Sequence, residues 1–198
     1  MQFKVFEPDI EVWGVMLHWA VAGFRILPET GMRYLARHGL VTPGPDGKLR
    51  IDTNVWYPLE TWLGCYEAIT REVGANVMLD IGRSLGAKGA VPPHIKGLEQ
   101  AMLWLDPAYH EYHKKRGELM YDVATGRMLE GIGHYHAHCV PGAQKIIMHC
   151  ENPYSCDFDH GVLVGYSNRF NSRSRVEHDA SAPCRKLGSN SCTYVITW

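Results

Sequence analysis

The chain has 198 residues, of which 45% are hydrophobic and 21% charged, and its formal net charge is −1. A chain of this length buries a core without disulfide staples. The near-neutral charge argues against the basic surface of a nucleic-acid-binding domain, because the one cationic triplet is residues 114–116. We therefore expect no nucleic-acid partner.

The beginning of the chain, MQFKVFEPD, lacks the basic and apolar segments of a secretory signal peptide. The apolar stretch 12–27 is interrupted by His18 and Arg25, which makes it too short and too polar for a membrane span. We expect a cytoplasmic protein without a membrane span. Thiols stay reduced there, so its cysteines point to metal binding or catalysis rather than to disulfides.

The first half of the chain is predicted to be helical. Apolar residues recur at helical spacing over 10–27, and a second short helix over 29–38 ends at Gly39. The Pro- and Gly-rich segment 41–48 is predicted to be a loop. We place a boundary there, between an N-terminal helical arm (1–45) and a main ligand-binding domain (46–198).

More helices are expected before the pattern changes. An amphipathic stripe predicts a helix from Leu59 to Gly74, and two more are expected over 77–85 and 95–105. Asp106 and Pro107 are predicted to cap and begin another helix that ends at Gly117. Gly82 and Gly86 do not form a phosphate-binding loop.

The second half of the chain favours strands. Strands are expected over 119–124, 128–140, 145–150, 175–178 and 193–198, with one helix over 159–170. Helices followed by strands predict an α+β fold, in which an antiparallel sheet packs against helices.

Four of the six cysteines lie near the C-terminus, as two pairs, Cys150/Cys156 and Cys184/Cys192. Both spacers are loop-like, and thiolates on turns can converge on one tetrahedral zinc ion. A sulfur-rich shell favours zinc or an iron–sulfur cluster over magnesium or calcium. His178, shortly before Cys184, is a candidate to complete the shell. The alternative is that these cysteines are small buried apolar residues.

Histidines form a second pattern. His134, His136 and His138 share one face of the strand expected over 128–140, where they form either a metal site or a solvent-facing polar row. His110 and His113 are placed on the polar face of a helix, with a haem or metal pocket as the alternative. The six tryptophans and ten tyrosines either fill the core or line a cavity for an apolar ligand.

The C-terminal residues resemble the 4-vinyl reductase, or hydrocarbon-binding, domain family. The resemblance lies in CDFDHGVLVGY (156–166) and in RVEHDASAPCRKLGSNSCTYVITW (175–198), which contains Cys184-x3-Gly188-x3-Cys192. A weaker upstream part covers PLE (58–60) and EVGANVMLDIGRSLG (72–86).

This resemblance implies a fold related to haem-based nitric oxide sensors and to vesicle-tethering subunits. Family members include the sensor domains of phenol-responsive activators, which bind a small aromatic in a buried pocket beside a structural zinc held by three cysteines and a glutamate. Another member is implicated in reducing a vinyl group of bacteriochlorophyll precursors. By position, Cys156, Cys184 and Cys192 match the three family cysteines.

The chain departs from the family at the glutamate, because Ser181 stands at that position. Cys150 is our first candidate for the fourth ligand and His178 our second, ahead of Glu177 and Asp179. We expect a stand-alone sensor, or a free-standing domain with another role, without the ATPase and DNA-binding domains of the activators.

The sequence thus predicts a homodimeric sensor domain that binds a small apolar ligand and carries a structural zinc site. One alternative is an enzyme that holds iron or another metal on the histidine strand and acts on a hydrophobic substrate. A second is a haem gas sensor, with His110 or His134 as the axial ligand.

Overall fold

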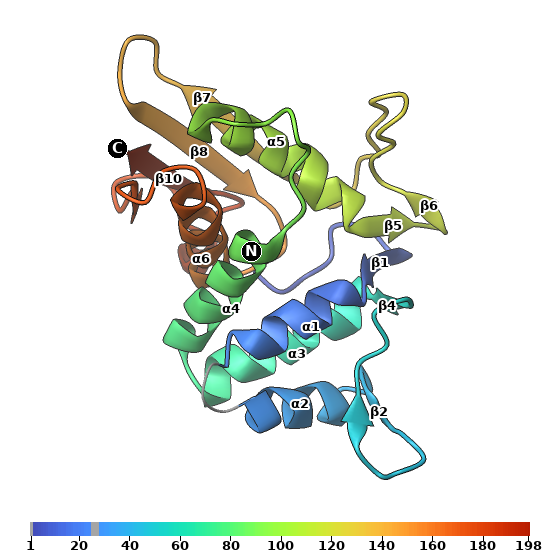
Figure 1. The fold of residues 1–198 in the computed structure, drawn as a ribbon. Coiled ribbons are helices and arrows are strands. Elements are labelled where there is room, and N and C mark those ends of the chain that lie inside the picture. Colours follow the sequence, from blue (N-terminus) through green and yellow to red (C-terminus); the bar gives the residue numbers. More distant parts are fainter. Residues whose placement is uncertain (1, 25–27) are drawn as a thin grey trace.

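A computed structural model describes residues 2–24 and 28–198. Helices and antiparallel sheets make up the fold, so the predicted α+β class is confirmed (Figure 1). The helices are α1 (Val15–Ala22), α2 (Pro28–Arg37), α3 (Leu59–Glu72), α4 (Ala75–Lys88), α5 (Leu98–Glu111) and α6 (Cys156–Asn168), with a short 3-10 helix η1 (Arg185–Leu187).

The strands form two four-stranded sheets and a small hairpin, all antiparallel. The first sheet has the order β4 (Trp56–Pro58), β1 (Ile10–Trp13), β5 (His113–Lys115) and β6 (Glu118–Leu119). The C-terminal sheet has the order β7 (His134–Cys139), β8 (Lys145–Glu151), β10 (Cys192–Thr197) and β9 (Arg175–His178). The hairpin pairs β2 (Thr42–Pro43) with β3 (Leu49–Arg50).

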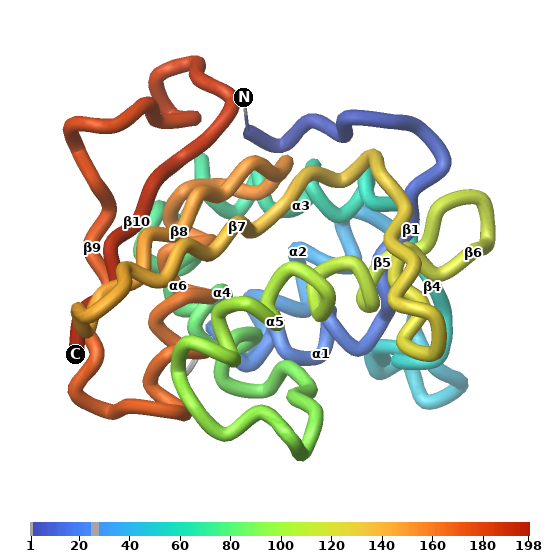
Figure 2. The backbone as a smooth tube through the Cα atoms, turned by 90° about the horizontal axis from the view of Figure 1, so that it is seen from above, coloured from blue at the N-terminus to red at the C-terminus, as the bar shows by residue number. Residues whose placement is uncertain are grey.

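The C-terminal sheet lies on one side of the molecule, and α1, α2 and α3 lie on the other (Figures 1 and 2). Helix α5 packs on β7, and α6 packs on both α4 and β9. Residues of the first 45 positions belong to the same hydrophobic core as the rest, because Leu17, Leu35 and Leu40 are buried in one cluster with residues of α3, α4 and the C-terminal sheet.

Two predicted helices begin elsewhere than expected. Over 10–27, the first residues form strand β1 instead, because β1 pairs with both β4 and β5, and Gly14 separates it from α1. Residues 25–27 lie outside the described residues. Asp106 and Pro107 do not begin a helix but lie inside α5. Pro107 follows the exposed Leu103 by four positions, so the hydrogen bond that it removes lies on the solvent side of α5.

The second half follows its predicted pattern, although two of the predicted strands are shorter than expected. The strand expected over 128–140 is confined to β7, and the one over 119–124 to β6, while Tyr121 and Met128 bridge the turn between them. Helix α6 begins three residues before the predicted start, because the hydroxyl of Ser155 accepts a hydrogen bond from the Phe158 amide at 3.2 Å.

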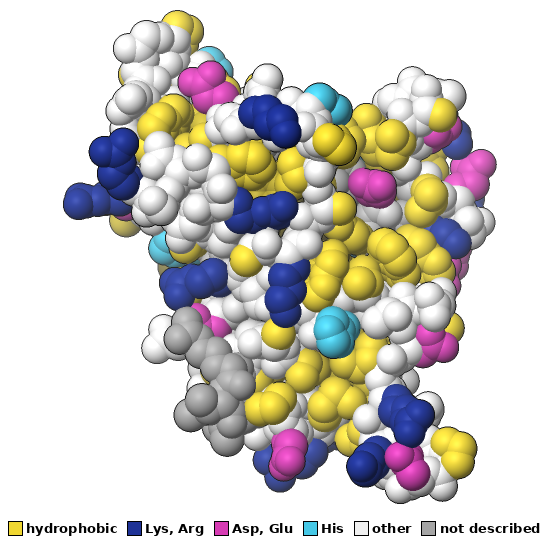
Figure 3. Space-filling view, in the orientation of Figure 1, with side chains coloured by type: hydrophobic (Ala, Val, Ile, Leu, Met, Phe, Trp, Pro, Cys, Tyr) yellow, Lys and Arg dark blue, Asp and Glu magenta, His cyan; other side chains and the backbone are white. Residues whose placement is uncertain are grey.

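Positive and negative side chains are interspersed on the face drawn in Figure 3, with hydrophobic side chains between them. Among residues 2–24 and 28–198, no helix combines the length and apolar character needed to cross a bilayer.

Four glycines set the closest helix contact of the fold. Gly82 and Gly86 in α4 face Gly161 and Gly165 in α6, and a Cβ atom at any of them would lie under 3.0 Å from the opposite backbone. The two backbones approach this closely only because these positions carry no side chain. Gly82 and Gly86, which form no phosphate loop, thus serve the packing of α4 on α6.

We predict that Gly161→Ala lowers the free energy of unfolding by about 3 kcal/mol or more, because the added methyl group collides with the backbone of α4 at Leu79. Gly64→Ala is the matched control: Gly64 lies inside α3, and a Cβ atom added there would meet nothing within 4 Å, so this change should stabilise by about 0.5–1 kcal/mol. Urea unfolding of both variants measures the difference, and equal stabilities would contradict the close contact.

Candidate functional site

Three of the predicted cysteines converge. Cys156 begins α6, Cys184 precedes η1 and Cys192 begins β10. The Sγ atom of Cys156 lies 3.0 Å from that of Cys192 and 3.6 Å from that of Cys184, and Cys184 and Cys192 are 3.9 Å apart. A tetrahedral zinc with bonds of about 2.3 Å separates its sulfur ligands by about 3.8 Å. Two of the three separations match this spacing, and the one between Cys156 and Cys192 is shorter.

His178 completes this cluster. Its ligating nitrogen and the three Sγ atoms all lie within 4.8 Å of one another. Strand β9 brings His178 there by pairing with β10, where His178 is opposite Tyr194, two residues after Cys192. Its Nε2 atom is buried and has no hydrogen-bond partner within the described chain. An imidazole nitrogen grouped with three thiols suits a fourth metal ligand.

The other candidates for the fourth position lie elsewhere. Cys150 is opposite Cys192 in the β8–β10 ladder, but its thiol is not among the four clustered ligand atoms, and burial raises its pKa. Glu177 is exposed on β9. Asp179 accepts hydrogen bonds from the amide and hydroxyl of Ser181, at 2.9 and 2.6 Å. Of the two main candidates, the structure thus brings His178 into the cluster and leaves Cys150 in the core.

The surroundings of Cys192 favour its deprotonated, thiolate form. The hydrogen bond from Cys156 lowers the pKa of Cys192, and the backbone and side-chain N–H groups of Arg185 lower it further. The same hydrogen bond raises the pKa of Cys156. Metal ions bind the thiolate form of cysteine, so a lowered pKa at Cys192 suits a metal ligand.

A buried ion pair lies directly behind the cluster. The side chains of Arg185 and Asp159 are both fully buried and in contact. Arg185 also donates to the Asn152 carbonyl at 2.5 Å and to the Tyr154 carbonyl at 3.0 Å. Burial lowers the pKa of Arg185, but the charge of Asp159 and the contacts with Cys192 and Cys150 together outweigh this effect and leave the pKa raised, so the guanidinium stays charged.

Asp159 links this pair to the wall of a cavity. It accepts hydrogen bonds from the Tyr135 hydroxyl at 2.5 Å and from the Asn152 amide at 3.1 Å. Burial raises the pKa of Asp159, whereas Arg185 and both donors favour its ionised form. A chain of hydrogen bonds therefore runs from Cys192 through Arg185 and Asp159 to Tyr135.

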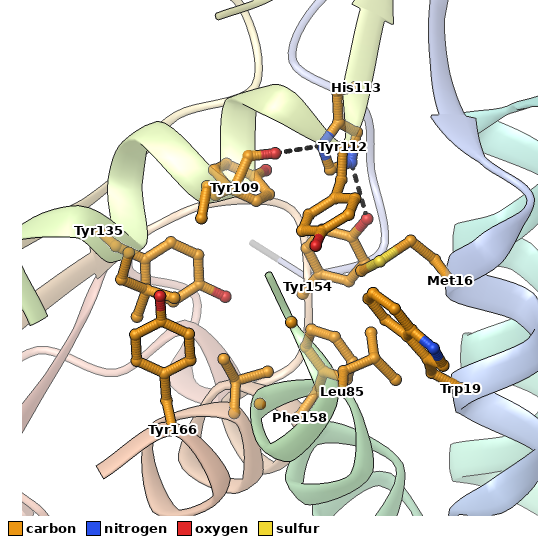
Figure 4. Close-up of a pocket in the computed structure, with 15 residues that line it drawn as sticks. Met16, Trp19, Leu85, Tyr109, Tyr112, His113, Tyr135, Tyr154, Phe158 and Tyr166 are labelled. Atoms are coloured by element: carbon orange, nitrogen blue, oxygen red, sulfur yellow. Dashed lines mark hydrogen bonds between the residues drawn. The ribbon is translucent and has the colours of Figure 1, made fainter. Parts of the chain in front are cut away.

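The cavity lies among α1, α4, α5, α6 and β7 and has a volume of about 50 Å³ (Figure 4). Its wall is mostly aromatic, formed by Trp19, Tyr109, Tyr112, Tyr135, Tyr154, Phe158 and Tyr166, with Met16, Leu85, Leu105, Ala108, His113 and Val162. The sequence predicted an aromatic-lined cavity, but not which aromatic residues line it.

Most polar groups of this wall are satisfied. The Tyr109 hydroxyl donates to the Ile132 carbonyl at 2.8 Å, and the Tyr112 hydroxyl accepts from the Ala90 amide at 2.8 Å. The buried hydroxyl of Tyr166 has no partner among the described residues. Its oxygen contributes no surface to the cavity, which is wholly apolar, so a polar ligand atom reaches it only if the ring moves.

His113 is the histidine of this wall; the candidate axial ligands His110 and His134 do not line it. Burial lowers the pKa of His113 to about 4, so the ring is neutral. Its Nδ1 atom bonds the Tyr109 carbonyl at 2.7 Å and its Nε2 atom bonds the Tyr154 hydroxyl at 3.0 Å. Both ring nitrogens are thus engaged.

The strand histidines diverge in their surroundings. His136 and His138 are exposed on β7, whereas His134 is half-buried and bonds the side chains of Asp106 and Glu130, each at 2.9 Å. One of the three histidines therefore has carboxylate partners, and these lie outside its own strand.

Sequence reasoning missed Arg185, Asp159 and Tyr135. Arg185 follows Cys184 directly and looks like an ordinary loop residue, because its burial depends on the cysteine cluster folding around it. Asp159 stands in the first turn of α6, where acidic residues are common. Neither residue carries a local signal of the pair that they form.

No family model matches this sequence, and no curated protein matches it. Solved structures do share its fold. An H-NOX protein from S. oneidensis in the Fe(II)NO ligation state matches with a TM-score of 0.62 and 15% identity, over 93% of this chain and 97% of that one.

Two further structures agree. Unliganded Fe(II) H-NOX protein from K. algicida gives a TM-score of 0.52 and 10% identity, over 93% of this chain and 95% of that one. A structure concerned with heme distortion in the H-NOX family gives 0.57 and 14%, over 93% and 94%. The chain has the fold of H-NOX domains, as expected from the relation to haem-based nitric oxide sensors.

We predict that Cys184→Ala lowers the metal content and the melting temperature, because a structural metal contributes to folding. Elemental analysis and thermal unfolding measure both quantities. Cys139→Ala, a half-buried thiol outside the cluster, is the control and should retain the metal. Unchanged metal content in Cys184→Ala would refute the site, and comparing His178→Ala with Cys150→Ala identifies the fourth ligand.

We predict that Arg185→Met lowers the free energy of unfolding by about 3–5 kcal/mol, because it leaves the charge of Asp159 buried without a partner. The neighbouring Lys186 pairs with Asp157 near the surface, with side chains 47% and 20% exposed, so Lys186→Met should cost only about 0–1 kcal/mol. Urea unfolding measures the free energy of unfolding of both variants. Equal losses of stability would show that the buried pair contributes no more than the exposed pair.

Proposed function

We propose that this chain is a sensor domain that binds a small, mainly apolar molecule in the aromatic cavity, next to a structural metal site. The observation that carries the proposal is the apolar cavity wall, which includes one buried hydroxyl without a partner among the described residues, that of Tyr166. Binding sites for small molecules are typically apolar, with few polar groups that fix orientation. The resemblance to the 4-vinyl reductase family, with its phenol-binding sensor domains, supports the same function.

The size of the cavity limits the ligand. A cavity of about 150 Å³ holds benzene in a well-studied engineered protein, and the present cavity measures about 50 Å³. A single ring therefore enters only if the wall moves, and Met16 is the lining side chain with the greatest freedom to do so. We propose a ligand no larger than one substituted ring, with one polar atom that pairs with Tyr166.

The metal site is proposed to be structural. Cys156, His178, Cys184 and Cys192 supply four ligands from α6, β9, the turn before η1 and β10, which leaves no open position on a tetrahedral ion. Zinc fits three sulfurs and one imidazole, and an iron–sulfur cluster is the alternative. The ion would join the edge of the C-terminal sheet to α6 and stabilise the position of Arg185.

A haem gas sensor is the second candidate. The H-NOX neighbours are Fe(II) proteins, and the buried His113 is an imidazole in the cavity wall. The residues do not fit haem in this conformation, however. The cavity is far smaller than the 300–1,000 Å³ typical of ligand sites. Its wall contains no Lys or Arg for the propionates, and the Nε2 atom of His113 is engaged by Tyr154.

Three further expectations remain proposals: the boundary near residue 45, the cytoplasmic location and the homodimer. Helix α1 buries Leu17 and Ala20 within its own chain and packs on α4, so its burial does not require a second copy. A dimer would have to use another surface.

Titrations of purified protein with phenol and benzene test the cavity, with Trp19 fluorescence as the readout because Trp19 belongs to the wall. Tyr166→Phe should weaken phenol binding about 3- to 10-fold, the effect of one hydrogen bond, and leave benzene binding unchanged. Ala108→Leu should abolish binding of both, because it fills the cavity.

Ala124→Leu makes the same change in an exposed turn and should leave both titrations unchanged. Saturable phenol binding that survives Ala108→Leu would place the ligand elsewhere. An absorption spectrum of the purified protein tests the haem gas sensor directly. A haem band that is present in the wild type and lost in His113→Ala would show that haem, not a small organic molecule, is the ligand.

A further inference from the structure

A second group of metal-ligating side chains lies between α5 and β7. Asp106 and His110 stand four residues apart on one face of α5, and His134 begins β7 beside them. One ligand atom of each lies within 4.8 Å of the others. The group shares no residue with the cysteine cluster, and its members come from two elements rather than from the histidine row of β7.

His110 has the tautomer of a metal ligand. Its Nδ1 atom donates to the Asp106 carbonyl at 2.9 Å, which leaves the lone pair on Nε2. The side chain is 0% exposed, and Nε2 has no partner within the described chain. A backbone acceptor that fixes one nitrogen and leaves the other free is the usual arrangement around a ligating imidazole.

His134 and Asp106 are held in place by hydrogen bonds to each other and to neighbouring residues. The Nδ1 atom of His134 lies 2.9 Å from Oδ2 of Asp106, and its Nε2 atom lies 2.9 Å from a carboxylate oxygen of Glu130. The other oxygen of Asp106 accepts the Tyr135 amide at 2.9 Å. Ligands of a tetrahedral metal with bonds of about 2.0 Å lie about 3.3 Å apart, so a small separation of Asp106 and His134 admits an ion.

The exposure of the group leaves one side open. His134 and Asp106 are 21% and 16% exposed, whereas His110 forms the buried base of the group. Two imidazoles and one carboxylate on the same side of an ion leave its outer positions to water. This differs from the cysteine cluster, where four protein ligands would enclose an ion.

We propose that Asp106, His110 and His134 bind a divalent first-row transition metal, such as zinc or ferrous iron, with an open coordination position. Glu130 orients His134 from behind and does not coordinate. The donors are nitrogen and oxygen only, so this metal is spectroscopically distinct from one held by the cysteines. The rival explanation is a metal-free network in which a protonated His134 bridges the carboxylates of Asp106 and Glu130.

Cobalt titration of the purified protein distinguishes the proposed metal site from the metal-free network. The protein is used as isolated, without any treatment of its cysteine site. The open site should take up Co²⁺ with weak visible bands and no intense sulfur-to-metal charge-transfer band, because none of its donors is sulfur. Cobalt bound to the cysteine cluster would show that intense band, so the absorption spectrum distinguishes binding at the two sites. A defect in the cysteine site therefore leaves this test intact.

His110→Phe preserves the buried ring but removes the ligand, and Asp106→Asn removes the charge. Each should weaken Co²⁺ binding at the open site at least about 100-fold, and Glu130→Gln should weaken it about 10-fold. Glu130 is 75% exposed, so Glu130→Gln keeps the test valid if a buried variant fails to fold. His138→Ala, an exposed histidine of the same strand, should leave binding unchanged.

Wild-type protein that shows no sulfur-free Co²⁺ spectrum at millimolar cobalt would overturn the proposal in favour of the metal-free network. Binding that is unaffected by Asp106→Asn and Glu130→Gln but lost in His138→Ala would also overturn it, since the ion would then sit on the exposed histidine row.

Discussion

The buried ion pair between Arg185 and Asp159 is the interaction on which the C-terminal half depends. Two charges removed from water are tolerated only when every donor and acceptor around them is satisfied. Here Asn152, Tyr154, Tyr135 and the thiol of Cys192 supply those partners. The pair therefore holds together four segments: the turn after β8, helix α6, the loop of η1 and strand β7. The pair contacts Cys192 on one side and Tyr135 on the other, so only two side chains connect the cysteine cluster to the cavity wall.

The packing of α4 on α6 supplies the other constraint. Glycines at four facing positions bring these backbones together, and both helices then contribute side chains to the cavity, Leu85 from α4 and Phe158, Val162 and Tyr166 from α6. A close backbone contact is rigid, since no side chain can rearrange within it. Movement that admits a larger ligand is therefore expected on the opposite wall, where α1 presents Met16 and Trp19.

This chain has the fold of H-NOX domains, and its cavity is lined mainly by aromatic side chains. Tyrosine rings form much of the cavity wall, and the one histidine of this wall bonds Tyr154 and a backbone carbonyl. At 10–15% identity the likeness concerns the path of the chain and not its chemistry. Function must accordingly be argued from the side chains, which carry the proposed small organic ligand and the two proposed metal sites, one around Cys192 and one between α5 and β7.

The sequence by itself determined the elements with a strong period, such as α3 and β8, the α+β class and the pattern Cys184-x3-Gly188-x3-Cys192, because each rests on local spacing. Only the tertiary structure decided which residues join them. His178 rather than Cys150 reaches the thiols because the register of β9 on β10 places it there. Asp106 and His110 meet His134 because α5 packs on β7, and Pro107 stays inside α5 because its missing hydrogen bond lies on the solvent side. Such long-range pairings depend on how separate elements dock, and no local pattern of residues encodes that.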